Sequence, residues 1–444
     1  MMCTRTEYDL LGEKEIPADV TWGIHTERAL ENFPMSGSRV APSLIAALAE
    51  VKKACALANK ELGLIDAAKA DAIIHACEQI ERHPECPLPA LQGGAGTSSN
   101  MFINEVIANQ AGHTIHPIED VNLNQSTNDV FPTAVKVAAI YGLRSLSAKV
   151  EKLQGSFQRL EIRFAHILTL GKTELVDAVP ITLGAEFGAF AEAFARDRWR
   201  TFKGEERLRV VNLGGTAVGT GLTAPRSYIF LVTDKLREIT GLGLSRAENM
   251  VDQTANADAF VEVSGLLKTS ASNLLKICGD LRLLHMNKKI KLPAVQAGSS
   301  IMPGKVNPVI LESVMQIGIK VQANDFIITE CASRGSLQMN EFMPLLASAL
   351  LESMELLGSA SEMLARHAEQ IEANEAECKK QFFQSVEIIT AFLPSIGYER
   401  ATELVEVFKA TERMDFKEYL MEELGAERVE KTLTPQNLMA MGHR

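Results

Sequence analysis

Several features that would place the chain in a broad class of protein are missing from its sequence. No run of 18 apolar residues occurs, so no segment is expected to span a membrane. The opening MMCTRTEYDLLGEKE has no apolar stretch like that of a secretory signal, and we expect no such signal. Acidic residues outnumber basic ones, 56 to 45, and the net charge of −11 argues against nucleic acid as a partner.

Disulfide and metal-binding patterns are also missing. The seven cysteines lie at positions 3, 55, 77, 86, 278, 331 and 378. They form no CxxC pair, which predicts reduced thiols in a cytoplasmic protein. The nine histidines show no HExxH pair or other ligand spacing, so we expect no zinc site and assign no metal ligand.

Helical patterns, in contrast, are abundant. A length of 444 residues allows two or three domains, and 46% hydrophobic with 23% charged residues is typical of a globular protein. Two helices are predicted within 42–83, and longer ones at about 182–209, 309–330 and 345–372. Strand-like alternation is scarce, so the fold class is mostly α. Residues 1–40 are rich in turns, and Trp22, His25, Thr26 and Arg28 there either border a pocket or form a satisfied structural cluster.

Two apolar seams with alternating three- and four-residue spacing predict long helices that pack in a bundle. One seam consists of Leu143, Leu146, Val150, Leu153, Phe157, Leu160, Phe164 and Ile167, and the other of Phe260, Val263, Leu267, Ser270, Leu274, Ile277, Leu281 and Leu284. The remaining faces carry Ala, Leu, Val and Met, so bundles from several subunits are expected to pack together. We predict an N-terminal helical domain (1–132), a central long-helix bundle (133–384) and a small C-terminal helical domain (385–444).

The segment GSSIMPGKVNP, residues 298–308, has the composition of an anion-binding loop before a helix. Gly298 and Gly304 allow backbone amides to approach a ligand, and Lys305 adds positive charge. Five residues separate the glycines and Val306 follows the lysine, so the segment does not fit a nucleotide-binding P-loop. A Gly/Pro-rich turn without chemistry is the alternative.

Two further hydroxyl-rich segments precede predicted helices. Thr97 and Ser98 follow the glycines of GGAGTSSN, and Ser126, Thr127 and Asn128 occur in NQSTNDVFPTA. Simple helix capping by Thr97 or Ser98 is the alternative at the first of them. Three such segments in one chain suggest a shared ligand.

These motifs resemble those of the aspartase/fumarase superfamily. GSSIMPGKVNP resembles its signature loop, and GGAGTSSNMFINEVIAN, QSTNDVFPTA, DAVPITLG, KICGDLRLL and TPQNLM follow in family order over essentially the whole chain. LLGEKEIPAD, WGIHTERALENF, GGAGT and LPAVQAGSSIMPGKVNPVI are more similar to the aspartate ammonia-lyase branch than to fumarases.

The resemblance implies a three-domain fold whose central bundle assembles four subunits around a 20-helix core. It also implies composite active sites, to which three subunits contribute, and a small dicarboxylate as substrate. The implied reaction is reversible anti-elimination of ammonia from L-aspartate or a close analogue, giving fumarate through an aci-carboxylate, with no organic cofactor.

The resemblance further assigns roles to individual residues. Ser299 matches the general base, acting as an oxyanion. Lys305 and Asn307 match residues that bind the carboxylate on which charge develops. Residues that hold the other carboxylate are matched by Thr97, Ser126, Thr127 and Ser300. Asn128 and Thr173 match positions near the leaving group.

Three departures from the family pattern bear on the substrate. Glu174 replaces the His or Gln that is usual after Thr173, and we hypothesise that it recognises the substrate's amino group. If Glu312 lies close to it, the two carboxylates would raise the pKa of one of them. Ile118 in HPIED and Leu123, where a Lys is common, are the other departures. A substituted aspartate therefore stays open as the substrate.

Two alternative functions stay open at this point. A fumarate hydratase is less well supported, because no His follows Thr173 to activate water. A catalytically silent structural homologue, similar to lens proteins of the superfamily, has no reason to retain Ser299, Lys305 and Asn307 together.

Overall fold

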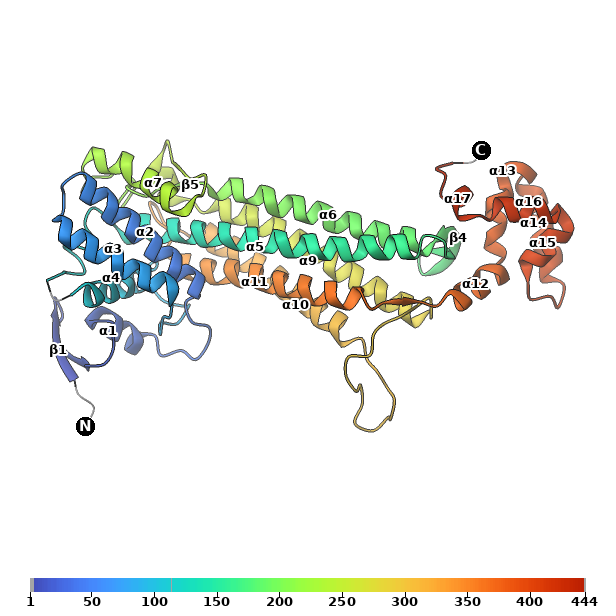
Figure 1. The fold of residues 1–444 in the computed structure, drawn as a ribbon, viewed down its shortest axis with the longest axis horizontal. Coiled ribbons are helices and arrows are strands. Elements are labelled where there is room, and N and C mark those ends of the chain that lie inside the picture. The colour runs from blue at the N-terminus through green and yellow to red at the C-terminus, as the bar shows by residue number, and fades with distance from the viewer. Residues whose placement is uncertain (1–3, 113, 443–444) are drawn as a thin grey trace. The chain divides into compact units, whose positions relative to one another are not determined.

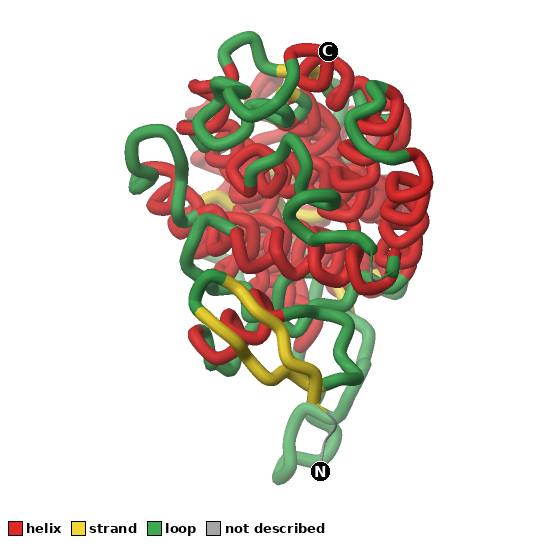
Figure 2. Tube along the Cα trace, turned by 90° about the vertical axis from the view of Figure 1, so that its left-hand side faces the viewer, coloured by secondary structure: helices red, strands yellow, loops and turns green. Residues whose placement is uncertain are grey.

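The computed structural model in Figure 1 describes residues 4–112 and 114–442. Helices dominate it, and the few strands form two-stranded sheets within the described residues (Figure 2), so the predicted mostly α class is confirmed. Cys3 lies outside the described residues; the other six cysteines are buried free thiols.

The chain divides into two compact units. Unit 1 comprises Met1–Ser147, Trp199–Thr269 and Lys320–Leu357, and unit 2 comprises Ala148–Arg198, Ser270–Ile319 and Gly358–Arg444. The three predicted domains, 1–132, 133–384 and 385–444, stay a prediction.

Five long helices supply residues to both units. They are α5 (Thr127–Arg163), α6 (Leu183–Leu208), α9 (Asp258–Met286), α10 (Val309–Ser333) and α11 (Met343–Ala368). The first predicted seam is buried throughout, although α5 ends at Arg163, so Phe164 and Ile167 follow the helix. In the second seam only Leu284 is partly exposed.

The long helices pack against one another within each unit. In unit 2 the rings of Phe157 on α5 and Phe194 on α6 lie 5.1 Å apart, edge to face. In unit 1 the Ser264 hydroxyl of α9 donates to Asp325 of α10 at 2.7 Å. These contacts agree with a bundle.

Unit 1 also contains shorter elements. They are β1 (Thr4–Asp9), β2 (Gly12–Pro17), α1 (Ile24–Asn32), α2 (Pro42–Glu61), α3 (Ala67–Arg82), α4 (Thr97–Ala111), β5 (Val210–Val211), α7 (Arg226–Thr240), β6 (Ser245–Arg246) and α8 (Met250–Ala255). Strands β1 and β2 form an antiparallel hairpin in register Thr4↔Pro17, whereas only turns were expected in this part of the chain. Strands β5 and β6 pair in parallel.

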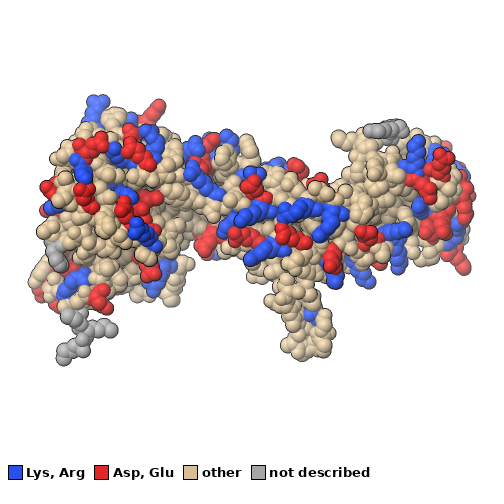
Figure 3. Space-filling model, in the orientation of Figure 1, with Lys and Arg blue, Asp and Glu red and all other residues tan. Residues whose placement is uncertain are grey.

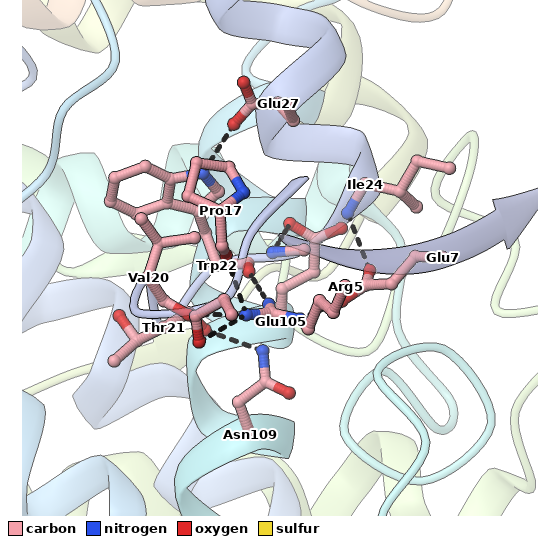
Figure 4. Close-up of polar contacts among 12 residues, drawn as sticks. Arg5, Glu7, Pro17, Val20, Thr21, Trp22, Ile24, Glu27, Glu105 and Asn109 are labelled. Carbon is pink, nitrogen blue, oxygen red and sulfur yellow. Dashed lines mark hydrogen bonds and ion pairs between the residues drawn. The ribbon is translucent and has the colours of Figure 1, made fainter. Parts of the chain in front are cut away.

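A buried carboxylate on α4 fixes the start of α1 (Figure 4). Glu105 accepts hydrogen bonds from the backbone N–H groups of Gly23, His25 and Thr26 and from the Thr26 hydroxyl. It therefore satisfies donors at the helix N-terminus that have no partner within α1.

Three of the four residues in the polar-aromatic group noted in the sequence have their side chains bound within the N-terminal segment or to α4. The Trp22 indole donates to Glu27 at 3.0 Å, and the Arg28 guanidinium donates to both carboxylate oxygens of Asp9. The Thr26 hydroxyl donates to Glu105, so three of the four side chains form hydrogen bonds that hold the N-terminal segment in place.

Unit 2 combines a hairpin with a small helical core. Its elements beyond the long helices are β3 (Leu168–Thr173), β4 (Val176–Thr182), β7 (Ile290–Lys291), β8 (Glu372–Ala373), α12 (Glu375–Gln384), the 3-10 helix η1 (Val386–Phe392), α13 (Leu393–Ile396), α14 (Tyr398–Lys409), α15 (Phe416–Leu424), α16 (Ala426–Thr432) and α17 (Pro435–Leu438). The short helices enclose an apolar core that includes Phe382, Phe392, Phe408 and Phe416.

A half-buried carboxyl in unit 1 links folding to pH. Tyr141 of α5 donates its hydroxyl to Glu50 of α2 at 3.1 Å. Burial, reinforced by Glu81, raises the pKa of Glu50 from 4.5 to about 7. The unfolded chain releases this proton near pH 4.5 and the folded chain near pH 7. The contribution of the protonated Glu50 carboxyl to the free energy of unfolding is therefore fully present below pH 4.5 and is lost as the pH rises through 7.

We predict that Glu50→Gln, which cannot ionise, raises the free energy of unfolding at pH 8 by about 1–2 kcal/mol. The gain should vanish near pH 4.5, as measured by urea unfolding at both values. Glu78→Gln is the matched control: its carboxylate pairs with Lys53 at 2.9 Å, so no gain is expected. Equal stability of parent and Glu50→Gln at pH 8 would contradict the assignment.

Candidate functional site

The segment 298–307 forms a loop that is closed by its own backbone. The Gly298 N–H donates to the Lys305 carbonyl at 2.8 Å, and the Asn307 side-chain amide donates to the Gly298 carbonyl at 2.7 Å. A Cβ on Gly298 would lie 2.8 Å from Asn307 N and from Lys305 O. Glycine is therefore needed at position 298 for the loop to close on itself. From the sequence, we expected it instead to let backbone amides approach a ligand. Gly304 has φ +82°, a left-handed conformation that suits glycine.

The Ser299 hydroxyl is held by the backbone of this loop. Its Oγ accepts the backbone N–H groups of Ile301 at 3.2 Å and Met302 at 3.0 Å. Two donors aimed at one hydroxyl oxygen favour a negative charge on it. The loop extends from the helices in Figure 1 and is largely uncharged in Figure 3, with Ser300 and Lys305 exposed.

Thr173 and Glu174 lie at the tip of the β3–β4 hairpin. Glu174 and Leu175 form its turn with φ values of 52° and 66°, although neither is glycine. A left-handed conformation costs such residues roughly 1–2 kcal/mol each. Glu174 is exposed, and no side-chain hydrogen bond or ion pair joins it to Glu312 or to the loop among the described residues.

The remaining predicted residues lie in unit 1, where α4 and α5 begin. Gly96 (φ 95°) precedes α4, and no side chain caps the helix. The Thr97 hydroxyl instead donates to the Gly94 carbonyl at 2.7 Å, so simple capping by Thr97 or Ser98 is wrong. Ser126 does cap α5, because its Oγ accepts the Asn128 N–H at 3.2 Å.

The structure brings these two segments together. The Asn100 side-chain amide of α4 donates to the Thr127 hydroxyl at 3.2 Å. Ala95, from the glycine-rich segment, and Asn128 line one small pocket, whose free volume is about 20 Å³. The pocket is completed by Pro132, Lys136, Gln253, Thr254, Asn256, Phe260, Met339, Asn340 and Met343.

Two buried charged residues hold these segments and were not assigned from the sequence. Asp129 is fully buried and accepts the backbone N–H groups of Ser126, Gly214 and Thr216 at 2.9–3.0 Å. Burial raises its pKa to about 6, opposed by those three bonds. Lys52 is also fully buried, which lowers its pKa to about 8, and it donates to the side-chain oxygens of Asn122 and Gln125.

The described residues contain no cluster of three or more His, Cys, Asp or Glu side chains suited to a metal ion. Within the same part of the chain, no helix is long and apolar enough to cross a membrane.

Comparisons with known proteins agree with this architecture. The Lyase family matches residues 12–323. Aspartate ammonia-lyases of Pseudomonas canavaninivorans and Escherichia coli are 44% and 41% identical, and the matches cover 98% and 89% of this chain and 97% and 87% of theirs.

Solved structures are similar over the same extent. The fumarate lyase:delta crystallin of Brucella melitensis bound to cobalt is 42% identical, with a TM-score of 0.93 over 98% of this chain and 99% of its own. A class II fumarase of Schistosoma mansoni is 28% identical, with a TM-score of 0.92 over 99% and 100%. The chain therefore belongs to the lyase family, within the aspartase/fumarase superfamily that its motifs resemble.

We predict that Gly298→Ala opens the 298–307 loop without unfolding unit 2. Hydrogen exchange at the amides of residues 301 and 302 should accelerate at least roughly tenfold, whereas the free energy of unfolding should change by less than about 1 kcal/mol. Gly279→Ala is the control, because its Cβ would meet open space on α9 of the same unit. Unchanged loop protection in Gly298→Ala would show that the loop does not depend on this contact.

Proposed function

We propose that the protein is a carbon–nitrogen lyase that removes ammonia from L-aspartate, or a close analogue, to give fumarate in a reversible anti-elimination. Relatives named aspartate ammonia-lyase, 40–44% identical over nearly their full length, are the observation that carries this proposal. The closed loop with Ser299, Lys305 and Asn307 supports it chemically. A role in cytoplasmic amino-acid metabolism without an organic cofactor is part of the proposal.

In the proposed reaction the Ser299 oxyanion removes a proton from the carbon next to a carboxylate. The electron pair of that C–H bond moves into the carboxylate, giving an aci-carboxylate with two negative charges. Lys305 and Asn307 bind this group, and such preorganised donors supply a large share of catalysis. The pair then forms the C=C bond as the C–N bond breaks and ammonia leaves, while Ser299 keeps the proton.

The other residues position the substrate in this proposal. The second carboxylate is held by the hydroxyls of Thr97, Ser126, Thr127 and Ser300. Asn128 and Thr173 lie near the leaving group, and Glu174 pairs with the substrate ammonium. An exposed Glu at a strained turn supports that last role, because such strain is often retained at binding sites.

We infer a homotetramer with a 20-helix core, in which each active site takes segments from three subunits. Exposed apolar side chains beside the proposed catalytic residues support assembly. Leu175 and Val176 at the hairpin tip are 71% and 66% exposed, and Ile301 in the loop is 84% exposed. Surfaces of this kind at functional segments are typical of interfaces.

A substrate panel tests the function. We predict that the protein forms fumarate, followed by its ultraviolet absorbance, from L-aspartate but not from L-malate. Ser299→Ala should lower kcat by roughly 10²–10⁴-fold, the range for a general base. Ser333→Ala, which changes an exposed serine at the end of α10, should keep the parental rate.

Three outcomes would redirect the proposal. Fumarate from malate alone would indicate a hydratase. Activity on substituted aspartates but not on L-aspartate would show that the substrate is a substituted aspartate. If Ser299→Ala is as active as the parent, Ser299 is not the general base, and the alternative of a catalytically silent structural homologue is favoured.

We predict separately that Glu174→Gln raises KM for L-aspartate about tenfold, because the ammonium loses an ion pair worth about 1.4 kcal/mol. Inhibition by malate, which lacks the ammonium, should not weaken. Glu372→Gln alters an exposed strand residue of the same unit and should change neither constant. Parental kinetics of Glu174→Gln on the amino acid would remove its assigned role.

A further inference from the structure

Lys52 is a fully buried cation on α2 that is bound to the segment just before Ser126. Its ammonium donates to the side-chain oxygen of Asn122 at 2.9 Å and to that of Gln125 at 2.8 Å. The buried Asp129 acts on it as an opposite charge. Its charge therefore needs no ligand, and the inference below depends on the direction of its hydrogen bonds.

A network of side chains continues from Lys52 to Thr127 at the start of α5. The Oδ1 atom of Asn122, which accepts the Lys52 ammonium, also accepts the amide nitrogen of Asn100 on α4 at 3.2 Å. The same Asn100 nitrogen donates to the Thr127 hydroxyl oxygen at 3.2 Å. Three hydrogen bonds thus connect Lys52 to Thr127, and we call these four residues the Lys52 network.

The chemistry of lysine fixes the direction of every bond in this network. An ammonium can only donate, so the Asn122 atom that faces Lys52 is the oxygen. That oxygen requires Asn100 to face it with the NH2 group of its amide, and the second N–H of this group points to Thr127. The Thr127 oxygen therefore accepts, which leaves its own proton for another acceptor. Within the described part of the chain, no side chain or backbone oxygen accepts that proton.

Other residue types at position 52 would not give this result. A glutamine carries both a donor and an acceptor, so it could face Asn122 in either orientation, and a methionine would bind neither. Support of α5 alone would not require a side chain that can only donate. Thr127 is half-buried, so its free O–H group can reach a ligand at the start of the helix.

We propose that Lys52 is a positioning residue, which orients Asn122 and Asn100 so that the Thr127 hydroxyl donates its proton to a carboxylate of the ligand. The inference rests on the proposed function, which assigns Thr127 to the carboxylate on which charge does not develop. Lys52 acts through the two asparagines. Hydrogen bonds in a buried network of this kind strengthen one another, because the surroundings screen them weakly.

A double-mutant cycle tests the proposal through binding of succinate, a dicarboxylate that cannot react, measured by calorimetry at pH 7. Thr127→Val should weaken binding at least about tenfold, the usual loss of a hydrogen bond to a charged group. Lys52→Met should weaken it at least about fivefold in the parent but less than about twofold in Thr127→Val, because its effect passes through the lost hydroxyl.

Two results of this cycle would overturn the proposal. Parental succinate affinity in Lys52→Met is the first. The second is an equal loss in both backgrounds, which would show that Lys52 acts by its charge or by general support of the fold. Lys235→Met is the control for loss of a lysine, since Lys235 pairs with Glu61 and Glu238, and it should keep the parental affinity.

A second pair of variants decides the question if Lys52→Met does not fold. Asn100 and Asn104 both donate to Asn122 Oδ1 at 3.2 Å, but only Asn100 also donates to Thr127. Asn100→Leu should therefore weaken succinate binding at least about fivefold, and Asn104→Leu less than about twofold. Equal effects of the two changes, or parental affinity in Asn100→Leu, would overturn the proposal.

The parent protein separates this proposal from the proposed function. A parent that does not bind succinate would overturn the role of Lys52, because the Thr127 hydroxyl would then hold no carboxylate. A parent that binds succinate but forms no fumarate from L-aspartate would instead remove the proposed function. The role of Lys52 would stand in that case, because the cycle measures binding alone.

Discussion

Holding a doubly charged small acid in a chain of net charge −11 is the constraint on which the proposed site depends. Repulsion from the acidic background must be overcome locally, by donors and cations concentrated in a small volume. The closed loop supplies two backbone N–H groups at Ser299 with Lys305 beside them. In unit 1, buried Lys52 donates to Gln125, the residue before Ser126, and adds positive charge there. The loop donors and the buried positive charge are in place before a ligand binds, so they need little reorganisation during the proposed reaction.

Buried charges also fix the backbone that carries these groups. Asp129 joins the start of α5 to the segment around Gly214 through three N–H donors. Glu105 performs the same task for α1. Removing either carboxylate would leave several backbone donors unsatisfied, which costs more than the bonds themselves contribute. The position of Ser126, at the start of α5, is therefore set by Asp129 and the backbone groups that it binds.

The sequence predicted the long helices because their seams repeat with helical spacing over many turns, as at Leu143 to Leu160. It did not predict the β3–β4 hairpin, because the turn at Glu174 and Leu175 uses no glycine or asparagine, the residues that usually mark one. The loop motif led to Ser299 and Lys305 as candidate site residues, which stay a prediction. The close contact of Gly298 with Asn307 depends on a fold-back that sequence spacing does not reveal.

Lys52, Asp129 and Lys136 were missed for a different reason. A charged residue in a helix is normally expected on its solvent face, and only packing shows that these three are buried. The available signal was a charge inside an apolar stretch, such as Lys136 between Val135 and Val137.

Mixing two inactive variants tests the central claim, that different copies of the chain build one site around the acid. Ser126→Ala and Ser299→Ala would be co-expressed with different tags, and tetramers carrying both tags assayed for fumarate formation from L-aspartate. Sites that combine an intact Ser126 from one copy with an intact Ser299 from another should raise the rate at least tenfold above either variant alone. A mixed assembly no more active than the two variants would show that each chain builds its site by itself.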